Sequence, residues 1–437
     1  MTDWTGRALH FVGIGGAGMS GLALVAAELG ATVTGSDARE SSYLAPLRAA
    51  GVAPAIGPHH AENVPAGAEV VFSSAVGPEN PERRSATGRE LHRAELLGEL
   101  TQLKRTIAVT GTHGKTTTSA MIVHALAGAG LDPGYLVGAE LRGSARNAAW
   151  GTGEWLVVEA DESDRSLLSL HPEVAVLTNA ELDHHATYGS RLELEETFAE
   201  FLGQARVAVV WDRPGLLALA PGEVVAYDAR DVVPEPGGVR FEWHGRAVRL
   251  AVPGEHNAVN AAGALEACRL AGADLDAAVP ALASFRGAGR RFEPLGSTSS
   301  GARVVDDYAH HPTEVAATLR AARSQAPARL LVAFQPHLFS RTAALARELG
   351  AALALADLVC VLDVYPARER PQDFPGVNGR RVAAAAADAA GGRPVAWLPA
   401  FADAEPWLRA QMRAGDLLVV MGAGDVDGLG HALVATR

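Results

Sequence analysis

The sequence has few lysines, few cysteines and no long apolar run, and each scarcity excludes a class of protein. Lys104 and Lys115 are the only lysines among 437 residues, and the formal net charge is -12. Nucleic acids and anionic membranes require a broad positive surface, so neither is an expected partner. Cys268 and Cys360 are too few for a disulfide framework or a cysteine metal cluster, which fits a reducing compartment.

The sequence shows no signal for export or for membrane insertion. The start, MTDWTGRALHFVGIGG, has no basic region followed by an apolar core and a cleavage site. No stretch reaches about 18 uninterrupted apolar residues, which a membrane-spanning helix would need. We therefore expect a cytoplasmic protein, and a monomer and a homodimer are equally compatible with the sequence.

The length exceeds the size at which one hydrophobic core keeps growing, so we expect three domains, at residues 1–104, 105–296 and 297–437. Apolar runs alternate with helical periods in each of them, which predicts an α/β fold with parallel sheets. The first domain is expected to be Rossmann-like, the second to be of the phosphate-loop type, and the third to be doubly wound. The expected strands are Leu9–Ile14, Thr32–Thr34, Trp155–Val158, Val174–Leu177, Val207–Val210, Val304–Asp306, Leu330–Phe334, Leu358–Leu362, Val395–Leu398 and Leu417–Met421.

Two further segments have clear local patterns. GVRFEWHGRAVRLAV alternates like a β-hairpin, and NAVNAAGALEACRLAG is typical of an Ala-rich helix. A helix is also expected at Ala17–Leu29 and around Ala383–Ala390.

The strongest motif is TGTHGKTTT, which runs from Thr110 to Thr118 between an apolar strand and a helix. In that position backbone N–H groups and a helix N-terminus can surround phosphates. Lys115 would reach the β- and γ-phosphates, and Thr116 would hold Mg²⁺. Val109 stands where the strict phosphate-loop pattern has glycine. The alternative is a glycine turn whose lysine extends to solvent.

A second glycine loop, HFVGIGGAGMSG, follows the first strand. Gly13, Gly15 and Gly18 have the spacing of a dinucleotide-binding loop, and Asp37 lies where an acid would bind a ribose hydroxyl. Taken alone the loop suggests NAD. The same loop accepts any diphosphate that lies across a helix N-terminus, and it can also be a purely structural turn.

Polar side chains follow two strands of the predicted middle sheet. VVEADESDRS places carboxylates where a strand ends, at the edge that can face the phosphate loop and bind Mg²⁺ through oxygen; they are Glu159, Asp161, Glu162 and Asp164. A helix N-cap cluster is the alternative, mainly for Asp164. TNAELDHHATY brings Asn179, Asp183 and His184 to the same edge, and His184 is a candidate ligand of a second metal ion.

The third domain carries two polar segments just after strands, DDYAHHPTE and FQPHLFSRT. Together they gather Asp307, Tyr308, His310, His311, His337 and Arg341. A hydrolytic zinc site is the competing interpretation of so many histidines. It is disfavoured because neither segment has a pair of histidines four residues apart together with a glutamate.

In chain order, GIGGAGM, TGTHGKTTT, EADESD, TNAELDH, GEHNAVNA, GAGRRFE, DDYAHHPTE, FQPH and DVYPARE resemble the Mur ligases along nearly the whole chain. GIGGAGM, EADESDRS and DDYAHHP resemble the alanine-adding branch in particular. The resemblance implies that ATP phosphorylates the lactyl carboxylate of UDP-N-acetylmuramate and that L-alanine then attacks the acyl phosphate. It also makes the first glycine loop a UDP-sugar site rather than an NAD site.

The resemblance further implies roles for individual residues. For the UDP-sugar these are Gly13, Gly15, Gly16, Gly18, Asp37 and Ser73. For ATP they are Gly111, Thr112, His113, Gly114, Lys115, Thr116, Thr117, Asn179, His256, Asn260, Arg291 and Asp307. For two Mg²⁺ ions they are Thr116, Glu159 and His184. For the amino acid they are Tyr308, His310, His337 and Arg341. The catalytic group comprises Lys115, Glu159, His184, His337 and Arg341.

Three departures from the family pattern and three rival functions accompany the resemblance. Ala186 replaces a carboxylate, Leu338 replaces a basic residue, and no lysine lies near His184 to form the carbamate that other Mur ligases use. The first two affect the expected amino-acid affinity, and the third agrees with the alanine-adding branch. The rivals are a murein-peptide recycling ligase, an NAD-dependent oxidoreductase, and an inactive UDP-sugar-binding regulator, which would have lost Lys115, Glu159 or His184.

Overall fold

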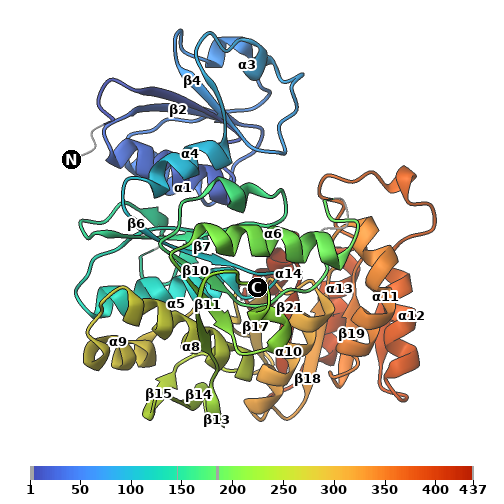
Figure 1. Ribbon diagram of the computed structural model, residues 1–437. Coiled ribbons are helices and arrows are strands. Elements are labelled where there is room, and N and C mark those ends of the chain that lie inside the picture. Colours follow the sequence, from blue (N-terminus) through green and yellow to red (C-terminus); the bar gives the residue numbers. More distant parts are fainter. Residues whose placement is uncertain (1–3, 145, 184–186, 436–437) are drawn as a thin grey trace. The chain divides into compact units, whose positions relative to one another are not determined.

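The computed structural model describes residues 4–144, 146–183 and 187–435, and the chain forms two compact units (Figure 1). The first unit comprises residues 1–228 and 259–283, and the second comprises 229–258 and 284–437. Helix α8 (Glu255–Leu270) begins in the second unit and ends in the first. Neither unit is therefore a single continuous stretch of sequence.

The first unit begins with a parallel sheet of order β3-β2-β1-β4-β5. Its strands are β1 (Ala8–Val12), β2 (Thr32–Asp37), β3 (Ala55–Ile56), β4 (Glu69–Phe72) and β5 (Glu90–His92). They are connected by α1 (Ala17–Glu28), α2 (Leu44–Ala49), the short helix η1 (Ala61–Asn63), α3 (Pro81–Arg84) and α4 (Arg93–Thr101). The strand order reverses at β1, which is where such sheets bind ligands beyond the carboxyl ends of their strands.

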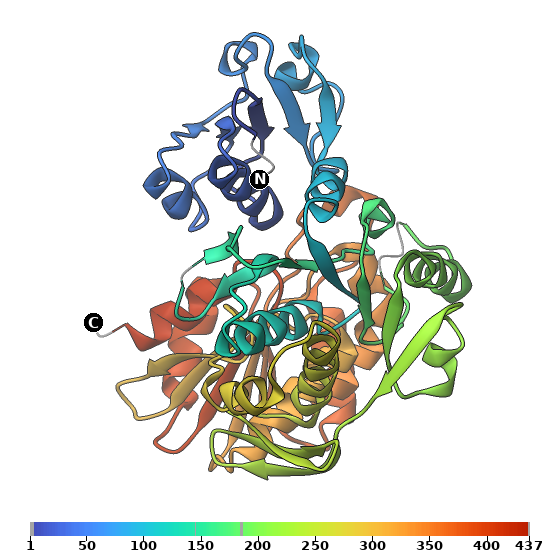
Figure 2. The same ribbon diagram turned by 60° about the vertical axis from the view of Figure 1, so that its left-hand side comes forward.

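The second sheet of this unit has the order β12-β11-β10-β6-β9-β7-β8, and only the β7–β8 pair is antiparallel among the strands described. Its strands are β6 (Arg105–Thr110), β7 (Gly134–Leu141), β8 (Arg146–Ala149), β9 (Trp155–Glu159), β10 (Val174–Leu177), β11 (Val207–Trp211) and β12 (Glu223–Tyr227). Its helices are α5 (Lys115–Gly128), η2 (Ser166–Ser169), α6 (Arg191–Gln204), α7 (Pro214–Leu217), α9 (Leu275–Ala281) and η3 (Leu282–Ser284). Figure 2 shows the chain passing from α4 into β6 and so from the first sheet to the second.

The second unit contains a small antiparallel sheet and a larger mixed one. The small sheet is β13 (Arg230–Glu235), β14 (Gly238–Trp243) and β15 (Arg246–Leu250). The larger, of order β16-β17-β21-β18-β19-β20, consists of β16 (Glu293–Ser297), β17 (Arg303–Asp307), β18 (Leu330–Phe334), β19 (Leu358–Val361), β20 (Val395–Trp397) and β21 (Leu417–Met421). Its helices are α10 (Pro312–Ser324), α11 (Phe339–Leu353), η4 (Pro371–Asp373), α12 (Gly379–Ala389), α13 (Phe401–Gln411) and α14 (Asp427–Val434).

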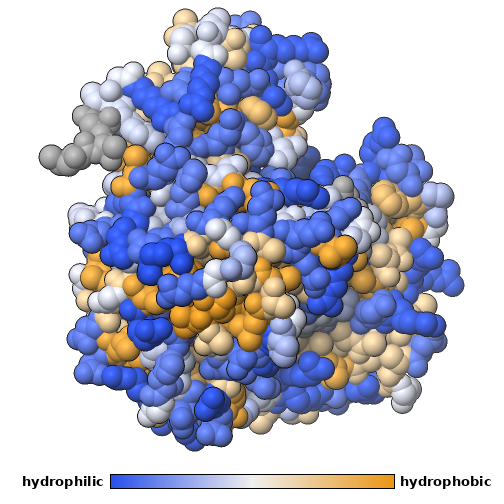
Figure 3. Space-filling view, viewed as in Figure 1, coloured by the Kyte–Doolittle hydropathy of each residue, from blue (hydrophilic) through white to orange (hydrophobic). Residues whose placement is uncertain are grey.

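Both faces of the larger sheet are buried, as β18 shows. Leu330, Val332 and Phe334 belong to one apolar cluster, while Leu331 and Ala333 belong to another on the opposite face. A strand covered on both sides needs apolar residues at every position, which is why β18 is a continuous apolar run. In the first unit, one apolar cluster extends through both sheets. In the part of Figure 3 that contains the first sheet, hydrophilic residues cover much of the visible surface.

The predicted three-domain α/β fold is confirmed, and the two boundaries between the domains, after residues 104 and 296, stay predictions. The strands predicted at Val174–Leu177, Leu330–Phe334 and Leu417–Met421 match β10, β18 and β21 to the residue. The predicted hairpin is β14–β15, with β13 as an unforeseen third strand. Among the described residues, no helix combines the length and the apolar character that crossing a bilayer requires.

A buried carboxylate joins several elements of the first sheet. Glu82 of α3 has no exposed surface, and its Oε2 accepts a hydrogen bond from Ser36 Oγ of β2 at 2.5 Å. The same oxygen lies 3.3 Å from His10 Nε2 of β1 and 3.3 Å from His59 Nδ1. Asn63 Nδ2 donates to Oε1 at 2.6 Å. Burial opposes ionisation of Glu82, but these partners lower the pKa of the carboxyl to about 2.

Replacing Glu82 by glutamine should therefore destabilise the protein in a pH-dependent way. At pH 7 the loss should be about 2 kcal/mol, because the variant loses hydrogen bonds to a charged group. The folded pKa lies below the ordinary value of 4.5, so this stabilisation is present above 4.5 and is lost as the pH falls toward 2. Urea unfolding of the native protein and of Glu82→Gln at pH 7, 4 and 3 measures the difference. Glu40→Gln, which removes an exposed ion pair with Arg48, is the matched control. A difference that stays constant over this pH range would contradict the prediction.

Candidate active site

The phosphate-binding motif forms a loop between β6 and α5, at the point where the strand order of the second sheet reverses. Gly111 and Gly114 have φ of +125° and +82°, which only glycine adopts without strain. A Cβ on Gly111 would also lie 2.2 Å from Thr178 Oγ1, and one on Gly114 would lie 2.8 Å from Asn260 Oδ1. The two glycines are thus required both by backbone conformation and by the close approach of neighbouring elements.

Lys115, the first residue of α5, turns back over this loop. Its Nζ donates to the carbonyl oxygens of Gly111 at 2.7 Å and Thr112 at 3.3 Å. It also forms an ion pair of 2.8 Å with Glu162 Oε2, whose side chain is fully buried. Burial opposes protonation of Lys115, but Glu162, Asp161 and Glu159 together raise the pKa of the amine above its ordinary value. The lysine is therefore a fixed cation at the mouth of the phosphate loop.

The next residue, Thr116, meets a second carboxylate. Its hydroxyl lies 2.9 Å from Glu159 Oε2 and 3.1 Å from Oε1, and Glu159 stands at the carboxyl end of β9. The backbone N–H of Gly138 donates to Glu159 Oε2 at 2.8 Å and so fixes the carboxylate. One hydroxyl and one carboxylate beside a phosphate loop are oxygen ligands of the type that Mg²⁺ prefers. The donor set therefore fits a magnesium ion.

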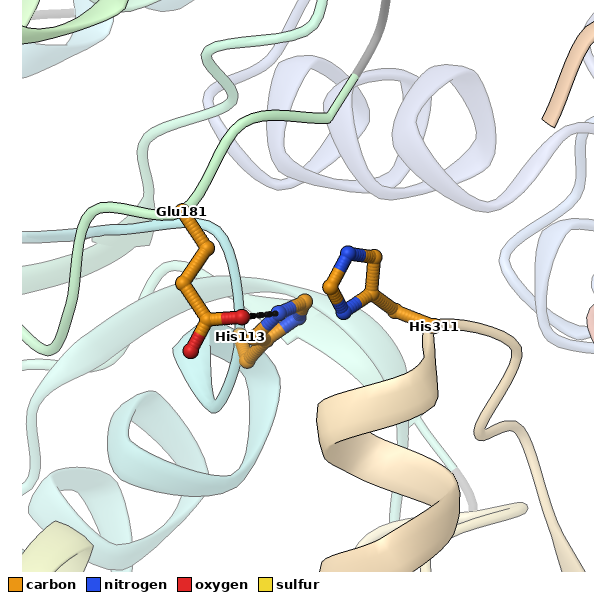
Figure 4. Close-up of side chains that lie close together, drawn as sticks. All are labelled: His113, Glu181 and His311. Carbon is orange, nitrogen blue, oxygen red and sulfur yellow. Dashed lines mark ion pairs between the residues drawn. The ribbon is translucent and has the colours of Figure 1, made fainter. Parts of the chain in front are cut away.

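Asn179, which follows β10, binds the backbone of the phosphate loop. Its Oδ1 accepts the His113 N–H at 2.9 Å, and its Nδ2 donates to the His113 carbonyl at 2.9 Å. The His113 ring lies 3.5 Å from the carboxylate of Glu181, as Figure 4 shows. Thr117 is in the first turn of α5 and Asn260 is in α8. The described phosphate-loop residues and Asn179, Asn260 and Glu159 are thus brought together in one unit.

The first glycine loop follows β1 and leads into α1. Its Gly13 N–H donates to the Ser36 carbonyl, and Gly15 N–H donates to Asp37 Oδ2 at 2.8 Å. Gly16 is the N-cap of α1, and Gly18 lies in its first turn. Ser73 follows β4, the neighbour of β1 on the other side. The six residues predicted for the UDP-sugar therefore lie at the carboxyl edge of one sheet, with Asp37 bound to the loop itself.

Asp307, Arg291 and His256 belong to the second unit. The Asp307 carboxylate accepts N–H groups from Phe292 and Ala309, both at 2.8 Å, yet burial raises the pKa of this acid to about 6. The guanidinium of Arg291 lies 4.9 Å from the ring centre of Tyr308. His256 lies in the first turn of α8, and burial lowers the pKa of its imidazole to about 4, so the ring is neutral at pH 7.

A row of rings runs from β17 to β18 in the same unit. Tyr308 and His310 meet edge to face with centroids 5.6 Å apart, and His310 meets His337 at 5.8 Å. Arg341, in the first turn of α11 and buried, places Nη1 3.0 Å from His337 Nδ1. The four residues predicted for the amino-acid site are therefore brought together. Tyr365, which stacks on His337 at 5.8 Å, extends the row and was not anticipated.

Leu338, at the position of a family departure, has a strained backbone. Its φ is +68°, which a branched side chain rarely adopts. Its N–H donates to the Tyr365 carbonyl at 3.0 Å, and Tyr365 N–H donates to the Pro336 carbonyl at 2.8 Å. This short bridge holds His337 beside Tyr365. The strained residue, Leu338, therefore directly follows one of the two stacked rings.

His184, predicted to bind a second metal ion, and Ala186, at the position of a family departure, lie outside the described residues. The sequence predicts Glu162 among the carboxylates that face the phosphate loop, but not its ion pair with Lys115. The contact between Tyr365 and His337 had no sequence signal, because their segments meet only through strand pairing in the folded sheet.

The chain belongs to the Mur ligase family. Three matches cover most of it: the Mur ligase family catalytic domain at residues 8–105, the Mur ligase middle domain at 109–268, and the Mur ligase glutamate ligase domain at 290–424. The first two matches contain the two glycine loops, and the third contains the polar segments that follow β17 and β18.

Curated relatives that match nearly the whole chain carry the name UDP-N-acetylmuramate–L-alanine ligase. UDP-N-acetylmuramate–L-alanine ligases of Mycobacterium sp. (strain JLS) and Streptomyces coelicolor are 44% and 45% identical to this chain, covering 98% and 97% of it and 95% and 96% of their own lengths. The structure of the UDP-N-acetylmuramate–alanine ligase of Thermotoga maritima has a TM-score of 0.83 at 28% identity and covers 98% of each chain. A murein peptide ligase from Psychrobacter arcticus shares the fold, with a TM-score of 0.72 at 24% identity over 98% of each chain.

Proposed function

We propose that this protein joins L-alanine to the lactyl carboxylate of UDP-N-acetylmuramate, at the expense of ATP, in peptidoglycan precursor synthesis. The observation that carries the proposal is the pairing of Lys115 with Glu162 and of Thr116 with Glu159 at the phosphate loop. This constellation lies in a chain similar over nearly its whole length to ligases named for that reaction. A nucleotide-sugar and ATP as substrates also fit a cytoplasmic enzyme.

The chemistry explains why a phosphate loop is needed. A carboxylate is a poor acyl donor, so its oxygen first attacks the γ-phosphorus of ATP, and ADP leaves. The alanine amine then attacks the acyl carbon and loses a proton, phosphate leaves, and an amide remains. Lys115 and the loop N–H groups stabilise the charge on the transferring phosphoryl group. The remaining contribution of the protein is to position the substrates and to exclude water.

Thr116 and Glu159 are the residues of this chain that would hold Mg²⁺, and His184 is predicted to join Glu159 at a second ion. When bound, magnesium would neutralise phosphate charge. Gly138 keeps the Glu159 carboxylate in place through its N–H. Asn179 holds the shape of the loop through its two hydrogen bonds to His113, and Asn260, His256, Arg291 and Asp307 are predicted to contact ATP.

The glycine loop after β1 is proposed to bind the UDP-sugar, with its diphosphate at the N-terminus of α1. Asp37 now accepts the Gly15 N–H, so a diphosphate that takes this N–H would release the Asp37 carboxylate to a ribose hydroxyl. Arg341 is proposed to bind the carboxylate of alanine, with Tyr308, His310 and His337 forming the walls of that site.

Phosphate release from ATP tests the proposal directly. Purified protein is incubated with Mg²⁺, ATP and UDP-N-acetylmuramate, and L-alanine, glycine, L-serine or the murein tripeptide is added in turn. Phosphate and an amide product formed preferentially with L-alanine are the expected result. Turnover with the tripeptide alone would identify a recycling ligase. The absence of turnover with every acceptor would refute the ligase proposal.

A further inference from the structure

Arg93 occupies a position that helix stability does not explain. It is the first residue of α4, whose N-terminus is closed by a capping box of His92 and Glu95. The partial positive charge of a helix N-terminus disfavours a cation there. The side chain is only 21% exposed, so the guanidinium is also largely removed from water. Its charge must be stabilised by other groups.

Two carboxylates of the acidic segment that follows β9 provide this stabilisation. Arg93 Nη2 donates to Asp161 Oδ2 and to Asp164 Oδ2, both at 3.1 Å. Asp164 also accepts a hydrogen bond from Ser74 Oγ at 2.6 Å, and Ser74 follows β4. Burial opposes ionisation of Asp164, but Arg93 and the hydrogen bonds hold the pKa of this carboxyl well below its ordinary value. The Arg93 guanidinium and the Ser74 hydroxyl, which come from α4 and from the loop after β4, thus hold the acidic segment in place.

Glu162, which with Ser163 lies between the two aspartates in the sequence, is the partner of Lys115. Its carbonyl accepts the Tyr188 hydroxyl at 2.6 Å and the Arg165 N–H at 3.0 Å, which hold the segment in a tight turn. Because Arg93 holds the aspartates on both sides of Glu162, it constrains where the Glu162 carboxylate lies. The position of Lys115 over the phosphate loop depends on that carboxylate.

The opposite side of the same guanidinium lies beside the first glycine loop. Arg93 Nη1 is 3.5 Å from the position that a Cβ would take on Gly18, in the first turn of α1. Helix α1 is itself attached to the second sheet, because Asn147 of β8 donates to the Ala17 carbonyl at 2.6 Å. Arg93 therefore lies between the loop proposed for the UDP-sugar and the segment that holds the phosphate-loop lysine.

We propose that Arg93 is a positioning residue for phosphoryl transfer: through Asp161 and Asp164 it fixes Glu162 and thereby aligns Lys115. This inference rests on the proposed function, because it concerns the same phosphate loop. Arg93 acts on the rate of the reaction with bound substrates rather than on the affinity for the sugar nucleotide. Misplacement of a catalytic group by about 1 Å can lower a rate about 100-fold.

The test compares kcat with UDP affinity in the full-length enzyme. Arg93→Met should lower kcat for amide formation by about 10- to 100-fold, while the Kd for UDP, measured by calorimetry, should stay unchanged. Arg93→Lys should keep most of kcat, because both aspartates meet the same nitrogen, Nη2, and one ammonium group can reproduce that geometry. Arg89→Met, which removes an exposed ion pair with Glu99, is the matched control and should match the native enzyme.

A double-mutant cycle separates positioning from general destabilisation. Asp164→Asn should lower kcat by a smaller factor than Arg93→Met, and the double variant should be no slower than Arg93→Met alone. Full additivity of the two effects would overturn the inference. So would a native kcat in Arg93→Met, or a loss confined to UDP affinity, which would make Arg93 a diphosphate ligand. If Arg93→Met does not fold, Asp164→Asn together with Asp161→Asn tests the same link. Failure of the native enzyme to turn over with any acceptor would refute the proposed function instead.

Discussion

Replacing Lys115 by methionine should lower ATP-dependent amide formation by about a thousandfold while leaving the protein folded. The amine is held at the mouth of the phosphate loop by two carbonyl oxygens and by Glu162. Removal of one preorganised charge donor from a site where negative charge develops costs about 100- to 1,000-fold in rate. Methionine keeps the length and the apolar stem of the side chain, so the change is one of charge. Single-turnover phosphate release measures the effect on the chemical step.

The composition of the chain offers an unusual control for this experiment. Lys104 is the only other lysine, and its Nζ donates to the carbonyls of Trp150 and Gly151 at 2.7 and 3.0 Å, away from the phosphate loop. Lys104→Met should therefore change thermal stability but not kcat. A Lys115→Met enzyme that retains a tenth or more of native activity would show that the loop N–H groups alone supply the charge stabilisation.

Replacing Glu159 by glutamine should lower activity by about two orders of magnitude and weaken binding of a divalent cation. The substitution keeps the size of the side chain and its ability to accept the Gly138 N–H, but it removes the negative charge opposite Thr116. A neutral amide oxygen is a much weaker ligand for a hard cation than a carboxylate is. Paramagnetic resonance of Mn²⁺ in the presence of a non-hydrolysable ATP analogue measures cation binding independently of turnover.

Glu173→Gln is the matched control for this substitution. Glu173 pairs with Arg105 at 2.7 Å on the opposite, amino-terminal side of the same sheet, and the arginine is 45% exposed. Its loss should change neither Mn²⁺ binding nor rate, because exposed ion pairs contribute little. Native Mn²⁺ affinity in Glu159→Gln would remove Glu159 from the metal site and leave it with a purely structural bond to Thr116.

The sequence predicted the strands of the parallel sheets well because these strands are buried on both faces. Val174–Leu177 is apolar at every position and is bounded by polar residues, so burial, pattern and length all agree. The edge strand β8 was missed for the opposite reason. β8, Arg146–Ala149, is a polar and small-residue segment that becomes a strand only by pairing with β7. Tertiary pairing decides such segments, and no local pattern reveals them.

The candidate site likewise contains residues that the sequence predicts and contacts that only the folded chain reveals. Lys115, Thr116 and Glu159 were predicted from residue type and from their place after strands. The structure places the Thr116 hydroxyl 2.9 Å from Glu159, and the Glu159 charge helps to raise the pKa of Lys115. The contacts of Arg93 were not predictable, because an arginine at the start of a helix carries no sign of which carboxylates it will meet. Those carboxylates lie more than 60 residues further along the chain.

The interleaving of the two compact units limits how this enzyme can be taken apart. The chain crosses from one unit to the other after residues 228, 258 and 283, so three covalent connections join them. A single proteolytic cut in any one connection leaves the other two intact and releases no unit. For the same reason, expressing residues 284–437 alone would omit the hairpin strands β13, β14 and β15, which belong to that unit. An independent fragment of the second unit would need a permuted gene that places residues 229–258 next to residue 284.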